Sequence, residues 1–526
     1  MNLAVPSLDT ETKKDFKTIL TRGPVVSAGN AINNEATPAL GLAYIAGFAK
    51  KHGYNVEIVD SIAEGLNQVW ELDIEGPIAC QGLSFDDIVS KIPDDVKVIG
   101  ISIMFSGEWP VQKQYIQFLK KKFPDALFIA GGEHITALTE FSLRDCPEID
   151  VCMKGEGESS FLSFLDQVNS DADIRQTSNI CYIDDNGEYI ENGTLSRIKS
   201  IDDIPWPYWP EGYLEKFWNA GKSFGTQVGI DMPLLASRGC PYQCTFCSNP
   251  SMWTMKYILR GVPDVIAEIK HYMSKYKIDS LQFYDLTAIT KKKWTIEFCE
   301  ALIKEGIDLK WSLPSGTRSE ALDEETLGLL KKTGCNYLVY APESGSDKTL
   351  KLIKKRVKLQ NLTKSIVTAK NLGIVVRANL IIGFPGETRK EMFKTIFYGL
   401  KLAFLGIDEV PINIYSSYPG SEIFQDLNKK NKVELNDKYF ISLVSINSDF
   451  ASLFPASVNE YARGTELAIY RLSAMLMNYF ISYTTRPMRI IRTLRNVFGG
   501  GNQAATVLEH RLKDARRRKS VDSVKA

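Results

Sequence analysis

Three cysteines on one short loop have the clearest potential for chemistry in this chain of 526 residues. Cys240, Cys244 and Cys247 form a CxxxCxxC triplet. Cubane iron–sulfur clusters normally take four cysteines, so a triplet with no fourth nearby leaves one iron open to a reactant. A zinc knuckle would need a fourth ligand close by, and the nearest candidates, His271 and Cys299, are too remote to complete one. The spacing therefore predicts a 4Fe-4S cluster rather than zinc or scattered core cysteines.

The same loop resembles that of the radical S-adenosylmethionine enzymes. In that superfamily the open iron chelates the amino and carboxylate groups of the nucleotide's methionine. Phe246, directly before the third cysteine, matches the family's usual aromatic residue. The resemblance implies S-adenosylmethionine as a cofactor and an electron donor such as flavodoxin or ferredoxin.

The stretch before the cysteines alternates apolar strand-like runs with helix-like runs. Strands are predicted over 17–20, 55–60, 97–103, 126–130 and 150–153, and helices over 38–52, 110–122, 135–143 and from Glu158. This βαβ rhythm is typical of an α/β fold with a doubly wound, Rossmann-like parallel sheet, which we assign to residues 14–170. Residues 171–232, with three prolines and several aromatic residues between 204 and 210, predict a linker packed against both neighbouring domains.

A second alternation occupies residues 233–430. Strands are predicted over 234–237, 280–284, 310–313, 337–340, 375–382 and 409–415, with amphipathic stretches between them. Six such units make a partial (β/α)6 barrel, which is also the fold that the resemblance implies. In barrels of this kind chemistry lies at the carboxyl ends of the strands, and the cysteine loop directly follows the first strand.

Polar residues after the next three strands are candidates for binding S-adenosylmethionine. By the resemblance, Asp285 would hold the methionine ammonium, and Arg318 could pair with the methionine carboxylate. Glu343 and Ser344 could bond ribose hydroxyls or the methionine head, although Pro342 stands where relatives often show glycine. A solvated strand-end carboxylate and a surface arginine are the alternative explanations for the first two.

A glycine-rich turn ends the fifth predicted strand of the barrel. Gly383 and Pro385 belong to the run Gly-Phe-Pro-Gly-Glu over 383–387. Glycine permits a close backbone approach or a positive φ, which would let an adenine edge pair with the main chain. Alone the run would be an ordinary turn, and its place after the fifth strand favours nucleotide binding.

Small residues at the strand ends of the first domain predict a ligand crevice at the switch point of the sheet. Neither GxGxxG nor GxxxxGK[ST] occurs in register there, and the acidic Glu133, Glu156 and Glu158 would repel a phosphate. These segments resemble the cobalamin-binding domain of cobalamin-dependent radical enzymes. The resemblance spans residues 14 to 430 and assigns cobalamin to Pro38, Ser102, Gly131, Gly132, Gly155 and Glu156.

One departure concerns the lower ligand of the cobalt. The DxHxxG signature is absent, because His52 and His134 lack the upstream Asp and the downstream Gly. Many radical relatives bind cobalamin without a protein imidazole, so we expect His134 to be a hydrogen-bonded loop histidine. A degenerate Rossmann-like domain with a structural or substrate role is the alternative.

The resemblance implies an enzyme that methylates an unactivated carbon of a small or hydrophobic substrate. A 5'-deoxyadenosyl radical would remove hydrogen, and methylcobalamin would deliver the methyl group. Anaerobic porphyrin cyclases share the architecture, so oxidative cyclisation or rearrangement is an alternative, and a non-catalytic iron–sulfur or cobalamin sensor is one from another class. A methylthiotransferase would carry three further cluster cysteines, whose motif Cys80, Cys146 and Cys152 do not reproduce. No individual catalytic residue is assigned.

Composition excludes some partners. The 63 basic and 63 acidic side chains cancel, so no overall field attracts nucleic acid. Nine cysteines in a chain of this length do not form a disulfide framework, and no run of 18 uncharged apolar residues or apolar leader occurs. We therefore expect a cytoplasmic protein.

The segment 431–526 loses the βα rhythm and is predicted to be mainly helical. Residues 470–480 form a strongly apolar helix candidate. After Pro487, Arg489, Arg492 and Arg495 recur every three residues among apolar ones, and a helix with a solvated basic face is the interpretation we favour. The alternative is peripheral contact with an anionic membrane, which would favour a lipid or another hydrophobic substrate. The basic run 516–519 predicts a disordered tail.

Overall fold

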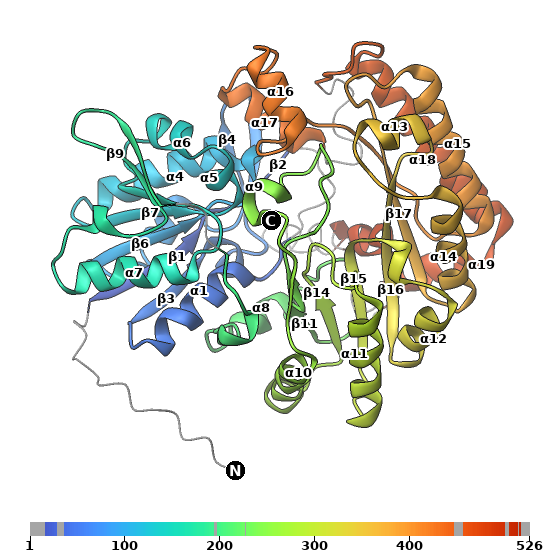
Figure 1. Ribbon diagram of the computed structural model, residues 1–526, viewed down its shortest axis with the longest axis horizontal. Coiled ribbons are helices and arrows are strands. Elements are labelled where there is room, and N and C mark those ends of the chain that lie inside the picture. The colour runs from blue at the N-terminus through green and yellow to red at the C-terminus, as the bar shows by residue number, and fades with distance from the viewer. Residues whose placement is uncertain are drawn as a thin grey trace.

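The computed structural model describes residues 16–28, 36–193, 197–226, 228–446, 456–499, 504–513 and 515–516. Two α/β units lie side by side, and a mainly helical C-terminal part covers the second unit and also reaches the first (Figure 1). Most of the predicted basic tail, residues 517–519, and the start of the first predicted domain, residues 14–15, lie outside the described residues.

The first unit is built on a seven-stranded sheet with the order β10-β9-β8-β7-β6-β1-β3. Five of its strands are parallel, and β9 and β10 add an antiparallel hairpin at one edge. The hairpin extends this sheet beyond residue 170, into the segment that the sequence predicted as a linker. The strands are β1 (Lys17–Arg22), β3 (Val56–Asp60), β6 (Val96–Ser102), β7 (Leu127–Gly131), β8 (Val151–Met153), β9 (Ile180–Ile183) and β10 (Tyr189–Asn192).

Helices cover both faces of this sheet because its central strands are apolar on both sides. One face packs against α1 (Leu40–Lys51) and α7 (Glu158–Asn169). The other packs against α3 (Phe85–Val89), α4 (Trp109–Lys122), α5 (Glu133–Ala137) and α6 (Thr139–Asp145). A small antiparallel sheet, which the sequence did not predict, lies beside it with β2 (Val25–Ala28), β5 (Pro77–Gln81) and β4 (Val69–Asp73) in that order, and α2 is Ser61–Glu64.

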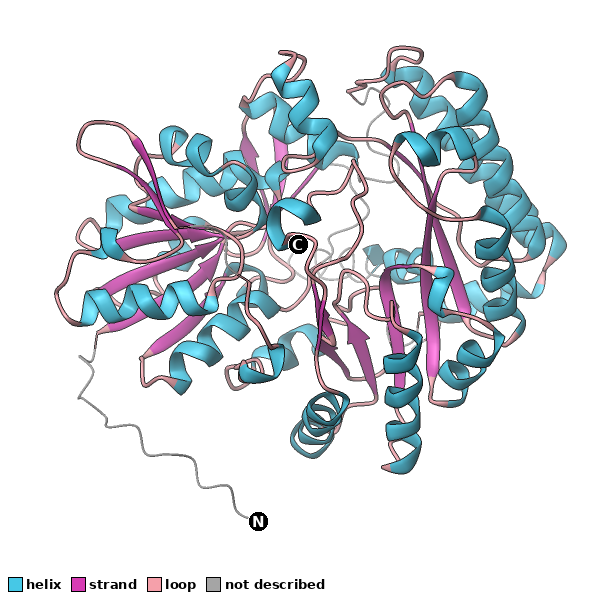
Figure 2. Ribbon diagram, in the orientation of Figure 1, coloured by secondary structure: helices cyan, strands magenta, loops and turns pink. Residues whose placement is uncertain are grey.

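The second unit is a six-stranded parallel sheet in the order β11-β14-β15-β16-β17-β18. Figure 2 shows the helices outside this sheet. Its strands are β11 (Asp231–Leu234), β14 (Ser280–Phe283), β15 (Lys310–Thr317), β16 (Cys335–Glu343), β17 (Val375–Ile382) and β18 (Ile412–Ile414). Its helices are α10 (Val262–Tyr276), α11 (Lys292–Lys304), α12 (Glu324–Lys332), α13 (Asp347–Leu352), α14 (Leu359–Asn371) and α15 (Arg389–Leu405). The predicted partial barrel is confirmed.

The first barrel strand differs from its predicted bounds of 234–237. It ends at Leu234, and Ser237–Arg238 instead form β12, which pairs antiparallel with β13 (Ile258–Leu259). Asp285 causes this turn, because its carboxylate accepts hydrogen bonds from the Ala236 amide and the Ser237 hydroxyl.

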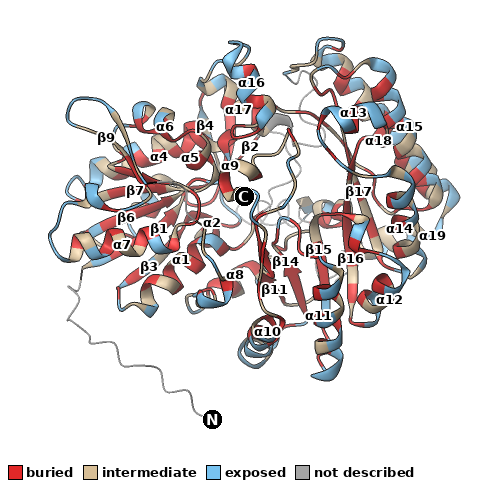
Figure 3. Ribbon diagram, viewed as in Figure 1, coloured by how far each residue is buried: buried red, intermediate tan, exposed pale blue. Residues whose placement is uncertain are grey.

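One continuous core connects the two units. It contains the barrel interior, part of α1 and the aromatic residues Trp209, Tyr213 and Phe217 on and just before α8 (Tyr213–Asn219). Figure 3 shows buried residues along the strands of both sheets. The two units are therefore held by shared apolar burial as well as by polar contacts.

The C-terminal helices are α16 (Glu422–Lys429), α17 (Asp437–Ile446), α18 (Gly464–Thr485) and α19 (Met488–Phe498). The predicted solvated basic face of α19 is wrong for Arg489 and Arg492, which bind groups of the protein interior. Within the described residues, no helix combines the length and hydrophobicity needed to cross a bilayer.

Candidate functional site

The cysteine loop, residues 239–248, runs from β12 to α9 (Asn249–Trp253). Its three cysteines are half-buried and form no disulfide. The Thr245 amide donates to the Ile353 carbonyl at 3.1 Å, and the Thr245 carbonyl accepts from the Ile423 amide at 3.0 Å. The loop is thus fixed between the end of α13 and the start of α16.

The donor set of this loop fits an iron–sulfur cluster. Burial raises the pKa of the three thiols, that of Cys247 to about 12, and the cations of Lys355 and Arg318 oppose the rise for Cys240 and Cys244. Thiolates are the form that binds iron, and neighbouring cations favour that form. In the described part of the chain, no group of three or more His, Cys, Asp or Glu side chains has the arrangement of a finished metal site.

Two of the predicted nucleotide-binding residues, Arg318 and Glu343, adjoin the cysteine loop. The Arg318 guanidinium lies 3.6 Å from the centre of the Tyr242 ring and also donates to the Arg356 carbonyl. Glu343 and Lys355 form a buried ion pair of 3.0 Å beside Cys244. Glu343 has a φ of +63°, a left-handed backbone that is uncommon for such a residue and often marks a functional site.

Lys355 is a residue that sequence reasoning missed. It stands in the basic run 354–356, where nothing distinguishes the one lysine that the fold buries.

The turn after β17 contacts the cysteine loop through aromatic rings. The Phe246 ring lies 5.6 Å from that of Phe384, between the predicted residues Gly383 and Pro385. The amides of Gly383 and Phe384 donate to Glu387, and Asn459 donates to the Phe384 carbonyl at 2.6 Å. Several main-chain groups that an adenine edge was expected to use are therefore already paired.

Two other predicted residues face the protein interior. Asp285 is buried, its carboxylate binds the turn before the cysteine loop, and burial raises its pKa to about 6. The Ser344 hydroxyl lies 2.8 Å from that of Thr395 and accepts from the Ser346 amide. Both residues position the backbone around the site in this structure.

The predicted cobalamin residues lie largely along one edge of the first sheet. Ser102 and Gly131 are register partners at the carboxyl ends of β6 and β7, and Gly155 follows β8. A side chain at Gly132 would come within 2.3 Å of the Ile103 carbonyl oxygen, so only glycine fits there. Pro38 precedes α1.

Exposed apolar side chains at the same edge fit a large, partly apolar cofactor. Met104 and Phe105 follow β6, next to the point between β1 and β6 where the strand order reverses, and Phe105 is 56% exposed. Ligands of such sheets bind in the crevice at this point. Sequence reasoning missed these two residues, because they resemble the end of an apolar strand.

His134 has no free nitrogen. Its Nδ1 lies 3.0 Å from the Ser106 hydroxyl and its Nε2 lies 3.2 Å from the Ser142 hydroxyl, while its ring stacks on Trp109. Burial lowers its pKa to about 3. Its contacts are those of a neutral structural histidine.

The loop after β7 touches the cysteine loop directly. Glu133 accepts a hydrogen bond from the Ser248 hydroxyl, one residue after Cys247. Burial raises the pKa of Glu133. The edge predicted for cobalamin and the loop predicted for the cluster are therefore in contact.

A buried ion-pair network reinforces this contact. Arg238 pairs with Glu158 at 2.5 Å and with Glu156 at 3.2 Å, and Arg197 pairs with Glu156 at 3.0 Å. The Arg238 guanidinium also lies 5.0 Å from the centre of the Tyr44 ring. The carboxylate of Glu156, predicted to bind cobalamin, thus joins the two units.

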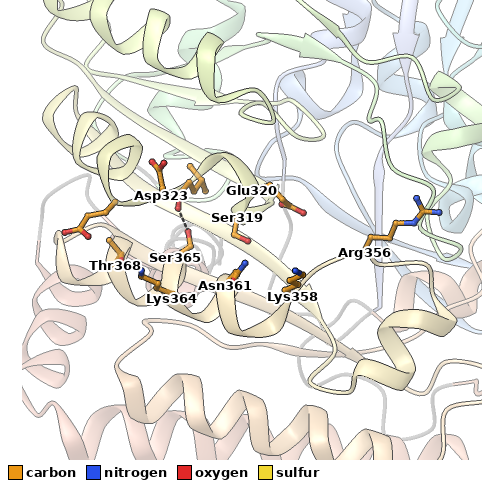
Figure 4. Close-up of a pocket in the computed structure, with 11 residues that line it drawn as sticks. Ser319, Glu320, Asp323, Arg356, Lys358, Asn361, Lys364, Ser365 and Thr368 are labelled. Carbon is orange, nitrogen blue, oxygen red and sulfur yellow. Dashed lines mark hydrogen bonds between the residues drawn. The ribbon is translucent and has the colours of Figure 1, made fainter.

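A pocket of about 660 Å³ lies between residues 319–324, which lead into α12, and α14 (Figure 4). None of the three cysteines lines it. Its walls carry opposite charges, from Arg356, Lys358 and Lys364 and from Glu320, Asp323 and Glu324.

Comparison with known protein families matches both units. Residues 34–165 match the B12 binding domain, and residues 234–398 match the Radical SAM superfamily. This chain is a radical S-adenosylmethionine enzyme with a B12-binding domain. The matched domains are those that use cobalamin and a 4Fe-4S cluster with S-adenosylmethionine, so the predicted enzyme class and cofactors are confirmed.

Similar proteins include enzymes of two reaction types. The chain is 29% identical to the cytidylyl-2-hydroxyethylphosphonate methyltransferase of Streptomyces wedmorensis, over 82% of this chain and 85% of the relative. It is 27% identical to an anaerobic magnesium-protoporphyrin IX monomethyl ester cyclase of Rubrivivax gelatinosus, over 78% of this chain and 70% of the relative.

A solved structure shares the whole fold. The methyltransferase TsrM from Kitasatospora setae, solved with cobalamin and a [4Fe-4S] cluster, superposes with a TM-score of 0.63 at 11% identity, covering 96% of this chain and 99% of TsrM. The likeness extends over both units and the C-terminal helices.

Proposed function

We propose that this radical S-adenosylmethionine enzyme methylates an unactivated carbon of a small or hydrophobic substrate. The observation that carries the proposal is the contact of Glu133 with Ser248, which joins the cobalamin edge of the first sheet to the cysteine loop. A radical source and a methyl donor have to reach one substrate carbon, and reacting groups held in place gain most of the entropic advantage of an intramolecular reaction. Relatives that are methyltransferases support the same reaction class.

The chain's own residues have separate tasks in this proposal. Cys240, Cys244 and Cys247 would hold the cluster, and the cations of Lys355 and Arg318 would stabilise its thiolates. When bound, the cluster with S-adenosylmethionine supplies a 5'-deoxyadenosyl radical, and cobalamin supplies a methyl group.

Other residues would position the two cofactors. Arg318 and Glu343 offer opposite charges for the methionine carboxylate and ammonium groups. Ser102, Gly131, Gly132 and Gly155 would line the cobalamin crevice, with Met104 and Phe105 as its apolar wall.

Oxidative cyclisation is the second candidate function, favoured by the cyclase relative. S-adenosylmethionine with a deuterated methyl group distinguishes the two reactions. Methylation transfers the deuterated methyl group to the product, whereas cyclisation leaves the product unlabelled.

The reductant is proposed to dock on the basic segment, residues 348–364. This segment contains no acidic residue, and Lys348, Lys351, Lys354, Arg356 and Lys358 are exposed on it. It contacts the cysteine loop through the Ile353 carbonyl, which accepts from the Thr245 amide, and its Arg356 carbonyl accepts from Arg318. An acidic electron carrier would be attracted to such a surface, directly beside the cluster loop.

A further inference from the structure

Three neighbouring helices expose large apolar side chains at one end of the molecule. α15, α18 and α19 lie together at the right of Figure 1, and α18 contacts both of the others. We call the exposed side the apolar helix surface and define it by six side chains that are 58–69% exposed: Phe397, Phe404, Leu476, Phe480, Ile491 and Phe498. Contiguous apolar surfaces of this kind mark interaction sites in proteins.

The outer face of α18 carries no charge. From Leu467 to Thr485 the one charged residue is Arg471, and it is buried. The exposed positions of this stretch are apolar or carry hydroxyl groups, whereas a surface helix normally turns its charged face to water. The sequence of α18 is therefore suited to an apolar environment on its outer side.

The orientation of α19 leads to the same conclusion. Arg489 donates to the carbonyls of Ile407 and Gly406 at 3.0 and 2.7 Å, and Arg492 pairs with Asp408 and Glu509. Because these two arginines are fixed inward, the apolar residues between them face outward. The amphipathic pattern of α19 thus exposes its apolar side.

The charges that remain near this surface are positive. Lys394, Lys401 and Arg495 are exposed on the same three helices. Of their two acidic residues, Glu391 is buried and Glu466 pairs with Arg389 at 2.6 Å. Within the described residues, the surface therefore combines apolar side chains with cations that have no acidic partner.

We propose that the apolar helix surface docks on an anionic lipid bilayer. Apolar side chains of amphipathic helices insert at the boundary of headgroups and acyl chains, and each nearby lysine or arginine adds attraction to anionic lipid. A two-fold dimer through this surface would instead bring the same cations of two copies together without an acidic partner. This docking is independent of the proposed reaction, because none of the residues involved belongs to the cofactor sites.

Flotation of the full chain with lipid vesicles tests the proposal. Wild-type protein should float with vesicles of phosphatidylcholine and phosphatidylglycerol, and less with phosphatidylcholine alone. Leu476→Glu combined with Phe480→Glu should reduce binding about tenfold or more, since a charge near the bilayer interior costs at least 1–2 kcal/mol. Ile303→Glu on α11, which replaces a 45% exposed apolar residue away from this surface, is the control and should float normally.

Two outcomes would overturn the proposal. The first is that wild-type protein does not float with vesicles that contain phosphatidylglycerol. The second is that light scattering detects a dimer of the wild-type protein, that this dimer does not float with vesicles, and that the double variant is a monomer. Circular dichroism of each variant verifies that it is folded. Because binding is measured without turnover, failure of the proposed methylation would not affect the result.

Discussion

Arg238 joins the two cofactor domains through groups almost completely withdrawn from water. Its side chain and those of Glu156 and Glu158 are each 2–4% exposed. Breaking a buried ion pair by removing one partner leaves an uncompensated charge, which costs more than the pair contributed.

Arg238→Met should therefore destabilise the cofactor-free protein by about 3–5 kcal/mol. The midpoint of urea unfolding measures this loss. Adding Glu158→Gln to Arg238→Met should recover part of the stability, because the carboxylate that lost its partner is gone, whereas Glu156 keeps its ion pair with Arg197. A single variant as stable as wild type would contradict the assigned role of the network.

The buried imidazole of His134 predicts that one contribution to the stability of the fold depends on pH. Its folded pKa of about 3 lies below the ordinary value of 6.5, so below pH 6.5 the unfolded chain binds a proton that the folded chain does not. The contribution of His134 to stability should fall as pH drops from 6.5 towards 3, by about 2 kcal/mol at pH 5.

His134→Gln should remove this component, since an amide can still bond both serines. The midpoints of urea unfolding of the variant and the wild type at pH 7.5 and pH 5 measure this contribution. Between these two pH values the wild type should lose more stability than the variant. Cobalamin binding should be retained, and its loss in the variant would indicate that the imidazole contacts the cofactor.

At the scale of elements, the basic segment, residues 348–364, is the proposed docking site of the reductant. Lys351→Glu combined with Lys358→Glu should slow cluster reduction by an acidic flavodoxin about tenfold or more at low ionic strength. Reduction by dithionite should be unchanged, because that small reagent needs no protein docking. Anaerobic stopped-flow absorbance follows both reactions.

Lys310→Glu with Lys332→Glu provides the control, since these residues are exposed at the amino-terminal ends of β15 and β16. Docking at the basic segment would be contradicted if both pairs of substitutions slowed cluster reduction by flavodoxin equally. It would also be contradicted if Lys351→Glu with Lys358→Glu slowed cluster reduction by dithionite.

Sequence periodicity predicted the repeated β-α units because strand and helix periods are local properties. It could not predict the hairpin β9–β10, whose short strands pair through the sheet edge rather than through an apolar pattern of their own. It also could not determine the orientation of α19. Periodicity separates an apolar from a basic face, but Asp408 and Glu509, distant in sequence, decide that Arg489 and Arg492 face inward.

The residues of the site also divide into those that a local sequence motif predicts and those that depend on contacts of the folded chain. The cysteine triplet and Phe246 carry a local motif, whereas Lys355 and the network of Arg238 depend on contacts made only in the folded chain. Asp285 and Ser344 could be assigned to the strand ends, yet their side-chain directions come from the Ala236 turn and from Thr395.

At the scale of the whole molecule, two cofactor domains meet through one contact surface and a shared core. This arrangement brings the loop after β7 to the cysteine loop. Cyclisation would use S-adenosylmethionine only as the source of the radical. Methylation consumes two molecules of S-adenosylmethionine, one as the source of the radical and one as the source of the methyl group.

The products derived from S-adenosylmethionine test this most directly. Reconstituted full-length protein, reduced anaerobically and supplied with cobalamin, S-adenosylmethionine and a small-molecule and lipid extract of its host, should form both 5'-deoxyadenosine and S-adenosylhomocysteine. Both should disappear in Cys244→Ala. 5'-Deoxyadenosine without S-adenosylhomocysteine would contradict methylation and favour cyclisation or rearrangement.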